Sequence, residues 1–222
     1  MGVTLRPGIH YCFANGRTAL LDIRRDRYLA LPDALDQAFQ ALAQGRDPST
    51  IEAAAIDDLI EDGILVRSRT DVAWSPAATI VRPTESLVDT PANAHADPGM
   101  FARAYVRQRI TNRSSLRLPD IVEDIRSDLE AVGPNRSSSP APHSLRALTS
   151  YLATRWLIST RDQCLTQSAT LFHFLAHYGW RPQFVVAVRM APFAAHAWLQ
   201  AGESVLNDRL DHVMPYTPIL VL

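Results

Sequence analysis

The stretch Phe184–Asp208, FVVAVRMAPFAAHAWLQAGESVLND, decides how the carboxyl-terminal part of the chain folds. Its first five residues are an unbroken apolar run rich in valine, which is typical of a buried strand. Two further strand patterns follow, Ala194–Gln200 and Ser204–Asp208, and only Ala-Gly-Glu separates them. A glycine in so short a connection predicts a β-hairpin.

The position of the turn predicts which residues of this hairpin lie opposite each other. Symmetry about Gly202 places Gln200 opposite Ser204 and His196 opposite Asp208. Directly opposed residues have their Cβ atoms about 5 Å apart on one face of the sheet. An imidazole and a carboxylate at that separation can form a hydrogen bond. We therefore predict that His196 and Asp208 are partners.

A cysteine precedes this hairpin at a position that favours reactivity. Cys164 falls at the start of a helix expected over Gln163–Tyr178, where unpaired N–H groups and the helix dipole favour a thiolate over a thiol. An isolated cysteine is more often a buried apolar side chain, as we expect for Cys12. A sulfur at a helix start, a base on a strand and a carboxylate on the next strand form a Cys-His-Asp arrangement. We predict Cys164 as nucleophile, His196 as base and Asp208 as the residue that orients it.

Two neighbours compete for these roles. Asp211 and His212 lie just beyond Asp208, and the opposed register favours Asp208 as the orienting residue. The oxyanion donor is expected to be the Cys164 backbone N–H together with one side chain, for which Gln163 is the candidate.

A second histidine pair lies within the same predicted helix. His173 and His177 share a helical face, as metal ligands would, but no glutamate follows His173 as it does in a zinc-protease helix. Their aromatic neighbours favour packing instead. We expect no metal site.

The first seventy residues predict a separate compact unit. Asn15-Gly16 between two apolar segments predicts a hairpin with a type I′ turn, and a third strand is expected near Tyr28–Leu31. Helical patterns follow between Pro32 and Gly45 and between Pro48 and Gly63, and then a returning strand at Ile64–Val66. Three strands and two helices predict a winged-helix-like module over residues 1–70.

The remainder of the chain predicts an α+β domain. Four prolines interrupt residues 71–99, which indicates a linker or an extended crossing segment. Helical patterns at 100–110 and 119–132 come before a loop rich in serine and proline, and a further helix begins near Ser144. Helices followed by strands over 100–222 predict a second domain that carries the chemistry.

Composition excludes several classes of function. The 222 residues carry 22 basic and 23 acidic side chains, a net charge of −1, which disfavours nucleic acid as a partner. All basic residues are arginine, so a P-loop and lysine-dependent catalysis are excluded. The start of the chain lacks the apolar core of a signal peptide, and no 18-residue apolar stretch follows. We expect a soluble cytoplasmic protein with reduced cysteines and no membrane partner.

Several short motifs carry a resemblance to a known family. They are RDQCLTQS at 161–168, Gly179-Trp180, AHAWL at 195–199, Asn207-Asp208 and YTP at 216–218. Together they resemble the transglutaminase-like B proteins of lasso-peptide biosynthesis over roughly residues 100–222. The front module is similar to the peptide-recognition element that such systems carry either fused or as a separate chain.

This resemblance implies a bacterial enzyme of defined fold and activity. The fold would be a winged-helix-like recognition module joined to a papain/transglutaminase-like cysteine peptidase domain. The peptidase would remove the leader from a ribosomally made precursor, after which a partner, an asparagine-synthetase-like cyclase, forms the macrolactam. The implied nucleophile, base and orienting residue are Cys164, His196 and Asp208. This chemistry requires no cofactor.

The resemblance also implies where the leader peptide binds. In such modules the peptide adds as a strand to the third strand and packs beside a helix. The matching positions are Arg27, Tyr28, Leu29 and Leu31 on the strand and Leu59 on the helix. Tyr28 and Leu29 fit equally well as ordinary core residues.

Two other functions fit the same residues. One is a thiol amidase or a transglutaminase that transfers the acyl group to an amine. The other is a non-catalytic subunit that presents a peptide and carries a vestigial triad. Selective alkylation of Cys164 would separate a working site from a vestigial one.

Overall fold

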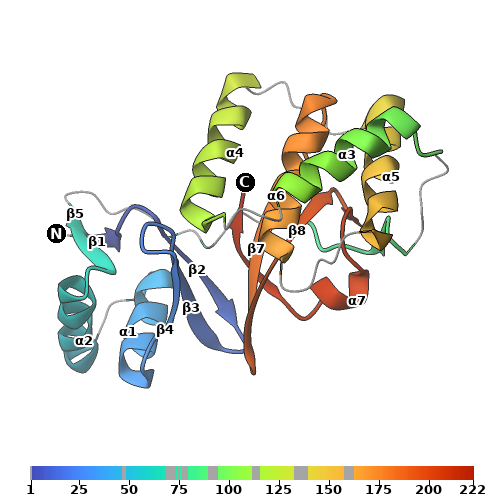
Figure 1. Ribbon diagram of the computed structural model, residues 1–222. Coiled ribbons are helices and arrows are strands. Elements are labelled where there is room, and N and C mark those ends of the chain that lie inside the picture. Colours follow the sequence, from blue (N-terminus) through green and yellow to red (C-terminus); the bar gives the residue numbers. More distant parts are fainter. Residues whose placement is uncertain are drawn as a thin grey trace. The chain divides into compact units, whose positions relative to one another are not determined.

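The computed structural model describes residues 2–46, 49–68, 74, 76, 80–89, 95–111, 116–132, 140–157 and 163–222 (Figure 1). The chain divides into two compact units. Unit 1 comprises Met1–Thr79, Val188–Ala194 and Thr217–Leu220, and unit 2 comprises Ile80–Ala187, Ala195–Tyr216 and Val221–Leu222. The described residues form a mixed α+β structure, as predicted. Among them, no helix is long and apolar enough to cross a membrane.

Unit 1 contains a three-stranded antiparallel sheet in the order β2-β3-β4. Its strands are β2 (Ile9–Ala14), β3 (Arg17–Asp22) and β4 (Arg27–Ala30). Asn15 and Gly16 form the first turn with φ angles of 53° and 76°, the left-handed values that a type I′ turn requires at both positions. The predicted hairpin is confirmed, with Ala14 paired to Arg17.

Two helices and a second small sheet complete unit 1. The helices are α1 (Asp33–Ala43) and α2 (Thr50–Glu61), and β1 (Gly2–Leu5) pairs with β5 (Leu65–Ser68). Ser49 and Glu52 form a capping box at the start of α2, in which each side chain accepts a hydrogen bond from the other residue's backbone N–H. The order of the predicted elements is confirmed, apart from β1, which the sequence analysis did not include. These elements do not by themselves show a winged-helix fold.

The core of unit 1 lies between its sheet and its helices. Tyr11 packs its ring edge against Phe39 at a centroid distance of 5.2 Å. Leu31 and Leu59 belong to the same buried cluster, with 4% and 0% of their surface exposed. Neither leucine offers side-chain surface to a ligand in this structure.

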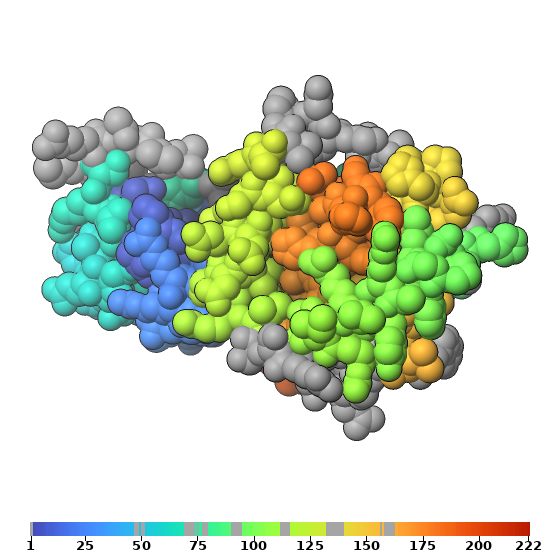
Figure 2. Space-filling model, turned by 45° about the horizontal axis from the view of Figure 1, so that its top comes forward, coloured from blue at the N-terminus to red at the C-terminus, as the bar shows by residue number. Residues whose placement is uncertain are grey.

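Helix α6 is the central helix of unit 2. Its bounds and those of its neighbours are α3 (Pro98–Thr111), α4 (Leu118–Val132), α5 (Pro142–Ala153) and α6 (Cys164–His177). The other three helices all pack against α6, and Figure 2 shows it in orange between α4 in yellow-green and α3 in green. Most residues of α6 beyond its first turn are buried, so its position is fixed by packing.

A five-stranded sheet runs in the order β10-β7-β8-β9-β6. Its strands are β6 (Glu85–Ser86), β7 (Gln183–Met190), β8 (Phe193–Ala201), β9 (Ser204–Val205) and β10 (Thr217–Val221), with the short helix α7 (Leu210–Val213) before β10. Strand β6 pairs in parallel with β9. The segment predicted as a linker or a crossing therefore contributes a strand to this sheet.

The register of the β8–β9 hairpin differs from the prediction by one residue. Ala201 pairs with Ser204 and Gln200 with Val205, so the turn contains only Gly202 and Glu203. Two-residue turns match the twist of antiparallel strands better than longer ones, and Gly202 takes a φ of 58° there. Strand β9 also ends at Val205, earlier than predicted.

The buried position of Leu59 leads to a prediction about stability. Replacing it (Leu59→Ala) should lower the free energy of unfolding by about 2–5 kcal/mol, because the change leaves a cavity in the core of unit 1. Urea denaturation followed by circular dichroism measures this loss. Leu157→Ala is the matched control, since Leu157 is 60% exposed and its truncation should change stability by about 0.5 kcal/mol or less. Equal losses in the two variants would contradict the placement of Leu59.

Candidate active site

The structure brings Cys164, His196 and Asp208 together within unit 2. Cys164 is the first residue of α6, His196 lies on β8, and Asp208 follows β9. His196 Nε2 lies 2.5 Å from Asp208 Oδ2, and the His196 ring also forms a hydrogen bond with the Cys164 sulfur. The three side chains thus form a continuous chain from sulfur to carboxylate.

The pair between His196 and Asp208 forms although its predicted register is wrong. Continuing the observed pairing by four residues in each direction from Gln200 and Val205 would place Arg209 opposite His196. The ladder stops before that point, because β9 ends and residues 206–208 bend away. Asp208 therefore reaches His196 from a bend and not from a strand.

Asn207 takes over the hydrogen bonding where the strand ends. The Leu206 N–H donates to the Leu199 carbonyl at 2.9 Å, which is the last backbone bond from this side. The Leu199 N–H then donates to the Asn207 side-chain oxygen at 2.7 Å. A side-chain carbonyl thus replaces a backbone one, and the chain is free to turn.

Hydrogen-bond donors surround the sulfur of Cys164. The backbone N–H groups of Leu165 and Ala197 and the ring of His196 all bond to it. Burial by itself would raise the pKa of this thiol, but the hydrogen bond and charge of His196 together with these N–H groups outweigh it and lower the pKa. The Gln163 side chain makes no capping bond at this helix start, so the first-turn N–H groups remain available to the sulfur.

The imidazole of His196 is stabilised in its charged form. Burial would lower its pKa, but the hydrogen bonds with Asp208 and Cys164 and their charges raise it to about 9. Burial likewise opposes ionisation of Asp208, whose pKa is nevertheless lowered by His196 and by the backbone of Arg209. The arrangement therefore favours the charged form of each group: a thiolate, an imidazolium and a carboxylate.

Asp208 is anchored on both of its side-chain oxygens. While Oδ2 faces His196, Oδ1 accepts a hydrogen bond from the Arg209 N–H at 2.7 Å and lies 3.1 Å from His212 Nδ1. The backbone carbonyl of Asp208 also accepts a hydrogen bond from Ser86 Oγ at 2.6 Å. Three contacts to the carboxylate and one to the backbone leave Asp208 little freedom to rotate away from the histidine.

Asp211, the other candidate for the orienting role, pairs with a different residue. Asp211 pairs with the Arg209 guanidinium at 3.1 Å and is largely exposed. His212, by contrast, lies with its Nδ1 3.1 Å from Asp208 Oδ1, whereas His196 contacts Oδ2.

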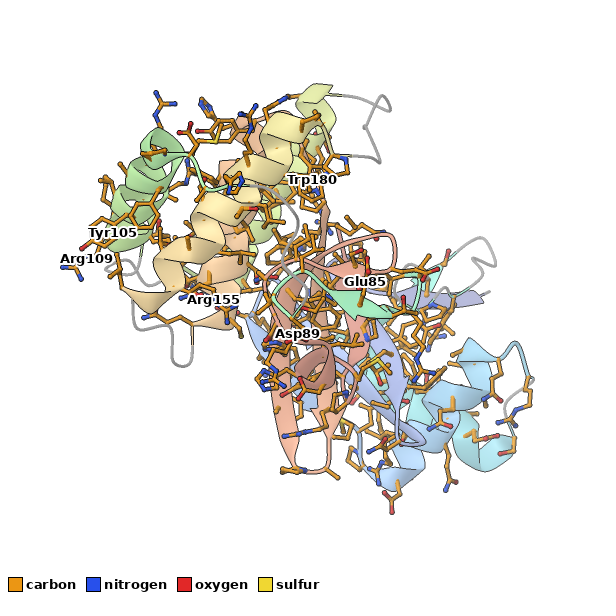
Figure 3. The ribbon with its side chains drawn as sticks, turned by 90° about the vertical axis from the view of Figure 1, so that its right-hand side faces the viewer. Glu85, Asp89, Tyr105, Arg109, Arg155 and Trp180 are labelled. Carbon is orange, nitrogen blue, oxygen red and sulfur yellow. The ribbon has the colours of Figure 1, made fainter. Side chains whose placement is uncertain are left out.

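The segment that contains β6 holds the far side of this bend. Asp89 follows β6 (Figure 3), accepts a hydrogen bond from the Leu210 N–H at 3.3 Å and pairs with the Arg209 side chain. Together with Ser86, it fixes the chain around Asp208. No sequence motif pointed to these two residues, because their role depends on the parallel pairing of β6 with β9.

Two aromatic rings line the histidine. Tyr216 lies at a centroid distance of 5.2 Å from the His196 ring and Trp198 at 6.0 Å. Such rings limit the access of water to the imidazole and favour the polarised hydrogen bonds described above. Both residues belong to motifs that the sequence analysis quoted without assigning a role to them.

The remaining predicted site residues are placed as follows. Gln163 precedes Cys164, and its Oε1 is buried with no hydrogen-bond partner among the described residues. Its role as an oxyanion donor stays a prediction. Cys12 is buried away from this chemistry, and burial raises its pKa to about 12. Within the described ranges, no group of three or more His, Cys, Asp or Glu residues is arranged to hold a metal.

The predicted peptide-binding residues on β4 lie in unit 1. Arg27 is exposed, whereas Tyr28 and Leu29 are half-buried. Tyr28 lies against Phe193 at a ring distance of 5.6 Å, and Leu29 packs on the core. Strand β4 pairs with β3 on one side only within the described sheet.

Comparison with known proteins gives one match. The profile of a family described as the transglutaminase-like superfamily matches residues 99–221. This range includes Cys164, His196 and Asp208. No curated protein and no solved structure gives a significant match to the chain.

The charge pair predicts how the two cysteines react. Because its pKa is lowered, Cys164 should be more ionised than an ordinary thiol as pH falls below about 8.5. Its rate of reaction with iodoacetamide should therefore fall less between about pH 9 and 7 than the rate of an ordinary thiol. In His196→Ala, the hydrogen bond and charge of the imidazole no longer oppose the effect of burial, and labelling at pH 7 should fall by about tenfold.

Cys12 serves as the internal control for this measurement. Its raised pKa should keep it unlabelled over the whole range, and peptide mapping by mass spectrometry separates the two sites. A rate at Cys164 that falls through an ordinary thiol pKa would contradict the charge pair.

Proposed function

Because the chain belongs to the transglutaminase-like superfamily, we propose that it is a cysteine peptidase that removes the leader from a ribosomally made lasso-peptide precursor. The single observation that carries the proposal is the continuous contact from the Cys164 sulfur through His196 to Asp208. The quoted motifs around these residues favour the lasso-peptide substrate over other peptides.

The first half of the reaction uses the charge pair directly. The thiolate of Cys164 attacks the carbonyl carbon of the bond between leader and core, forming a C–S bond and an oxyanion. The imidazolium of His196 then gives its proton to the leaving amine as the C–N bond breaks. The products of this half are a thioester on Cys164 and a core peptide with a free amino terminus.

The second half regenerates the enzyme. Neutral His196 takes a proton from water, and the resulting hydroxide attacks the thioester carbon. The C–S bond breaks, the leader leaves as a carboxylate and the sulfur leaves as a thiolate. Asp208 keeps one ring nitrogen occupied throughout, so the other nitrogen faces the reacting atoms.

The oxyanion is stabilised by backbone donors near the sulfur. The start of α6 supplies N–H groups and the positive end of the helix dipole. Gln163, directly before the nucleophile, is the proposed side-chain contributor.

Leader recognition is proposed for β4, the edge strand of the described β2-β3-β4 sheet. A peptide can extend the β2-β3-β4 sheet by hydrogen bonding along this edge, which gives affinity with little demand on sequence. Arg27 and Ala30 are exposed there, and the predicted residues Tyr28 and Leu29 are half-buried. Leu31 and Leu59 support the strand and helix from the core.

The proposed product explains the proposed partner. Macrolactam formation needs a free amine on the core peptide, and leader removal supplies it. An asparagine-synthetase-like cyclase, which activates a carboxylate for attack by an amine, is therefore the expected partner. A cytoplasmic location in a bacterium fits both a newly made precursor and a thiolate that must stay reduced.

Transfer of the acyl group to an amine would indicate a transglutaminase and not a peptidase. The same thioester reacts with an amine instead of water in a transglutaminase. Incubation of precursor peptides, taken from the short reading frames beside its gene, with and without a primary amine separates the two. Leader released as a free acid supports the peptidase, whereas leader joined to the amine under all conditions supports a transferase.

Removing the sulfur should separate cleavage from binding. Cys164→Ala should abolish leader removal, measured by mass spectrometry of the same precursor peptides, because no other group can form the acyl-enzyme. Its affinity for the peptide, measured by calorimetry, should stay within about twofold of the original. Proline at position 28 or 29 is the complementary change, because one of these two backbone N–H groups points away from β3. Whichever of the two proline variants keeps the thermal stability of the original protein should bind the precursor peptide more weakly. Cleavage by Cys164→Ala would disprove the nucleophile.

The carboxylates provide a matched pair of variants. Asp208→Asn should slow cleavage by about 10³-fold or more, since the shape is kept but the charge that orients and stabilises the imidazolium is lost. Asp211→Asn should change the rate by about twofold or less, because Asp211 contacts Arg209 and not His196. Steady-state kinetics of both variants on one precursor measure these two effects. The reverse order of effects would mean that Asp211 orients the base.

A further inference from the structure

A buried hydrogen-bonded network lies beside the three proposed catalytic residues without including any of them. Ser168 Oγ donates to the Ala197 carbonyl at 3.0 Å, and the Asn207 side-chain Nδ2 donates to Ser168 Oγ at 2.9 Å. The Leu199 N–H donates to Asn207 Oδ1 at 2.7 Å. The hydroxyl of Ser168, which is fully buried, thus uses both its donor and an acceptor position.

Each member of this network is adjacent to one residue of the site. Ser168 lies one helical turn after Cys164 on α6, Ala197 follows His196 on β8, and Asn207 precedes Asp208 in the bend. One hydroxyl and one amide therefore join the three separate segments that carry the nucleophile, the base and the acid. Rotation of α6 or a shift of the bend would break at least one of these bonds.

The bonding of Ser168 differs from that of an ordinary buried helical serine. Ser150 on α5 is equally buried, and its hydroxyl donates to the Arg146 carbonyl one turn earlier in its own helix. Ser168 instead donates across to another element. Ser150 also accepts a hydrogen bond from the Asp97 N–H outside α5. What distinguishes Ser168 is that its donor is used outside its own helix as well.

The asparagine is fixed by the same network. Its oxygen must face the Leu199 N–H, so its nitrogen must face Ser168. The Asn207 side-chain oxygen takes the place of a backbone carbonyl as the partner of Leu199. Strand β9 therefore ends, and the bend directs Asp208 toward His196. Ala197 completes the link, because its carbonyl binds Ser168 while its N–H bonds the Cys164 sulfur.

We propose that Ser168 and Asn207 are positioning residues that hold α6, β8 and the bend at Asp208 in the alignment needed for the contact between Cys164 and His196. The proposal rests on the proposed role of Cys164 as the nucleophile. Neither residue touches the reacting atoms, so both act through the neighbours that they fix. Loss of the network lengthens the contact between sulfur and imidazole and with it lowers the fraction of thiolate near neutral pH.

The test measures the pH profile of Cys164 alkylation by iodoacetamide, which requires no substrate. Ser168→Ala should reduce the rate at pH 6.5 by about tenfold and leave the rate at pH 10 within about twofold, because one unit of thiol pKa corresponds to about a tenfold change in thiolate. Ser150→Ala is the matched control. It also removes a buried serine hydroxyl with two hydrogen bonds, and it should lower thermal stability without moving the profile.

A double variant tests whether the two residues act as one device. Asn207→Ala should move the profile at least as far as Ser168→Ala, and combining the two should add little to the effect of Asn207→Ala. An unchanged profile in Ser168→Ala, or the same change in Ser150→Ala, would show that the serine only stabilises the fold. A wild-type profile with an ordinary thiol pKa would overturn the network's role as well. A third outcome separates the two proposals. If Ser168→Ala shows the expected change in the alkylation profile but the original protein cleaves no precursor, the positioning role stands and the proposed peptidase function is refuted.

Discussion

The contact between His196 Nε2 and Asp208 Oδ2 at 2.5 Å is the interaction on which the site depends. It raises the pKa of the imidazole against the effect of burial, and the charged imidazole in turn lowers the pKa of the Cys164 thiol. Without the carboxylate, burial would favour the neutral forms of both groups. The contacts of Asp208 with Arg209, His212 and Ser86 keep this carboxylate in place.

The carboxylate is held from a bend and not from a strand. Strand β9 is only two residues long, and three side chains replace the missing ladder: Asn207, Ser86 and Ser168. All three are neutral hydrogen-bonding groups, so they fix geometry without adding charge near the thiolate. Because α6 is enclosed by α3, α4 and α5, the other end of the contact is fixed by packing.

Unit 1 is organised around a different constraint. Its core encloses Tyr11, Leu20, Phe39 and Leu59 between sheet and helices, while β4 keeps one edge without a strand neighbour in the described sheet. Edge strands expose unpaired backbone groups, and proteins commonly cover or interrupt them. A short β4 that begins with an exposed arginine and keeps this edge is the feature on which the proposal of leader binding relies.

Much of this arrangement follows from local sequence. Asn15-Gly16 specifies its turn because both positions need left-handed φ angles, and Ser49 with Glu52 fixes the start of α2. Gly45, Gly63 and Gly179, all with positive φ, end helices where expected. Cys164 at a helix start and His196 on a strand likewise follow from patterns of a few residues.

The partnership of His196 and Asp208 was predicted correctly for the wrong reason. The symmetric register counted Ala201 as part of the turn, whereas the chain uses a two-residue turn and Ala201 pairs with Ser204. The error did not separate the two residues, because the ladder ends before it would reach them. What ends it is the Asn207 side chain, whose partner Ser168 lies on a helix distant in the sequence.

The sequence by itself determined most of the elements, though not β1 or β6, and the types of residue that carry the chemistry, because turns, caps and strand periodicity depend on neighbouring positions. Only the tertiary structure decided the alignment of those elements. The roles of Ser86, Ser168 and Asn207, the burial of Leu59 and the anchoring of Asp208 by His212 all depend on contacts between distant segments. Such contacts depend on how helices and strands pack, and no local pattern encodes them.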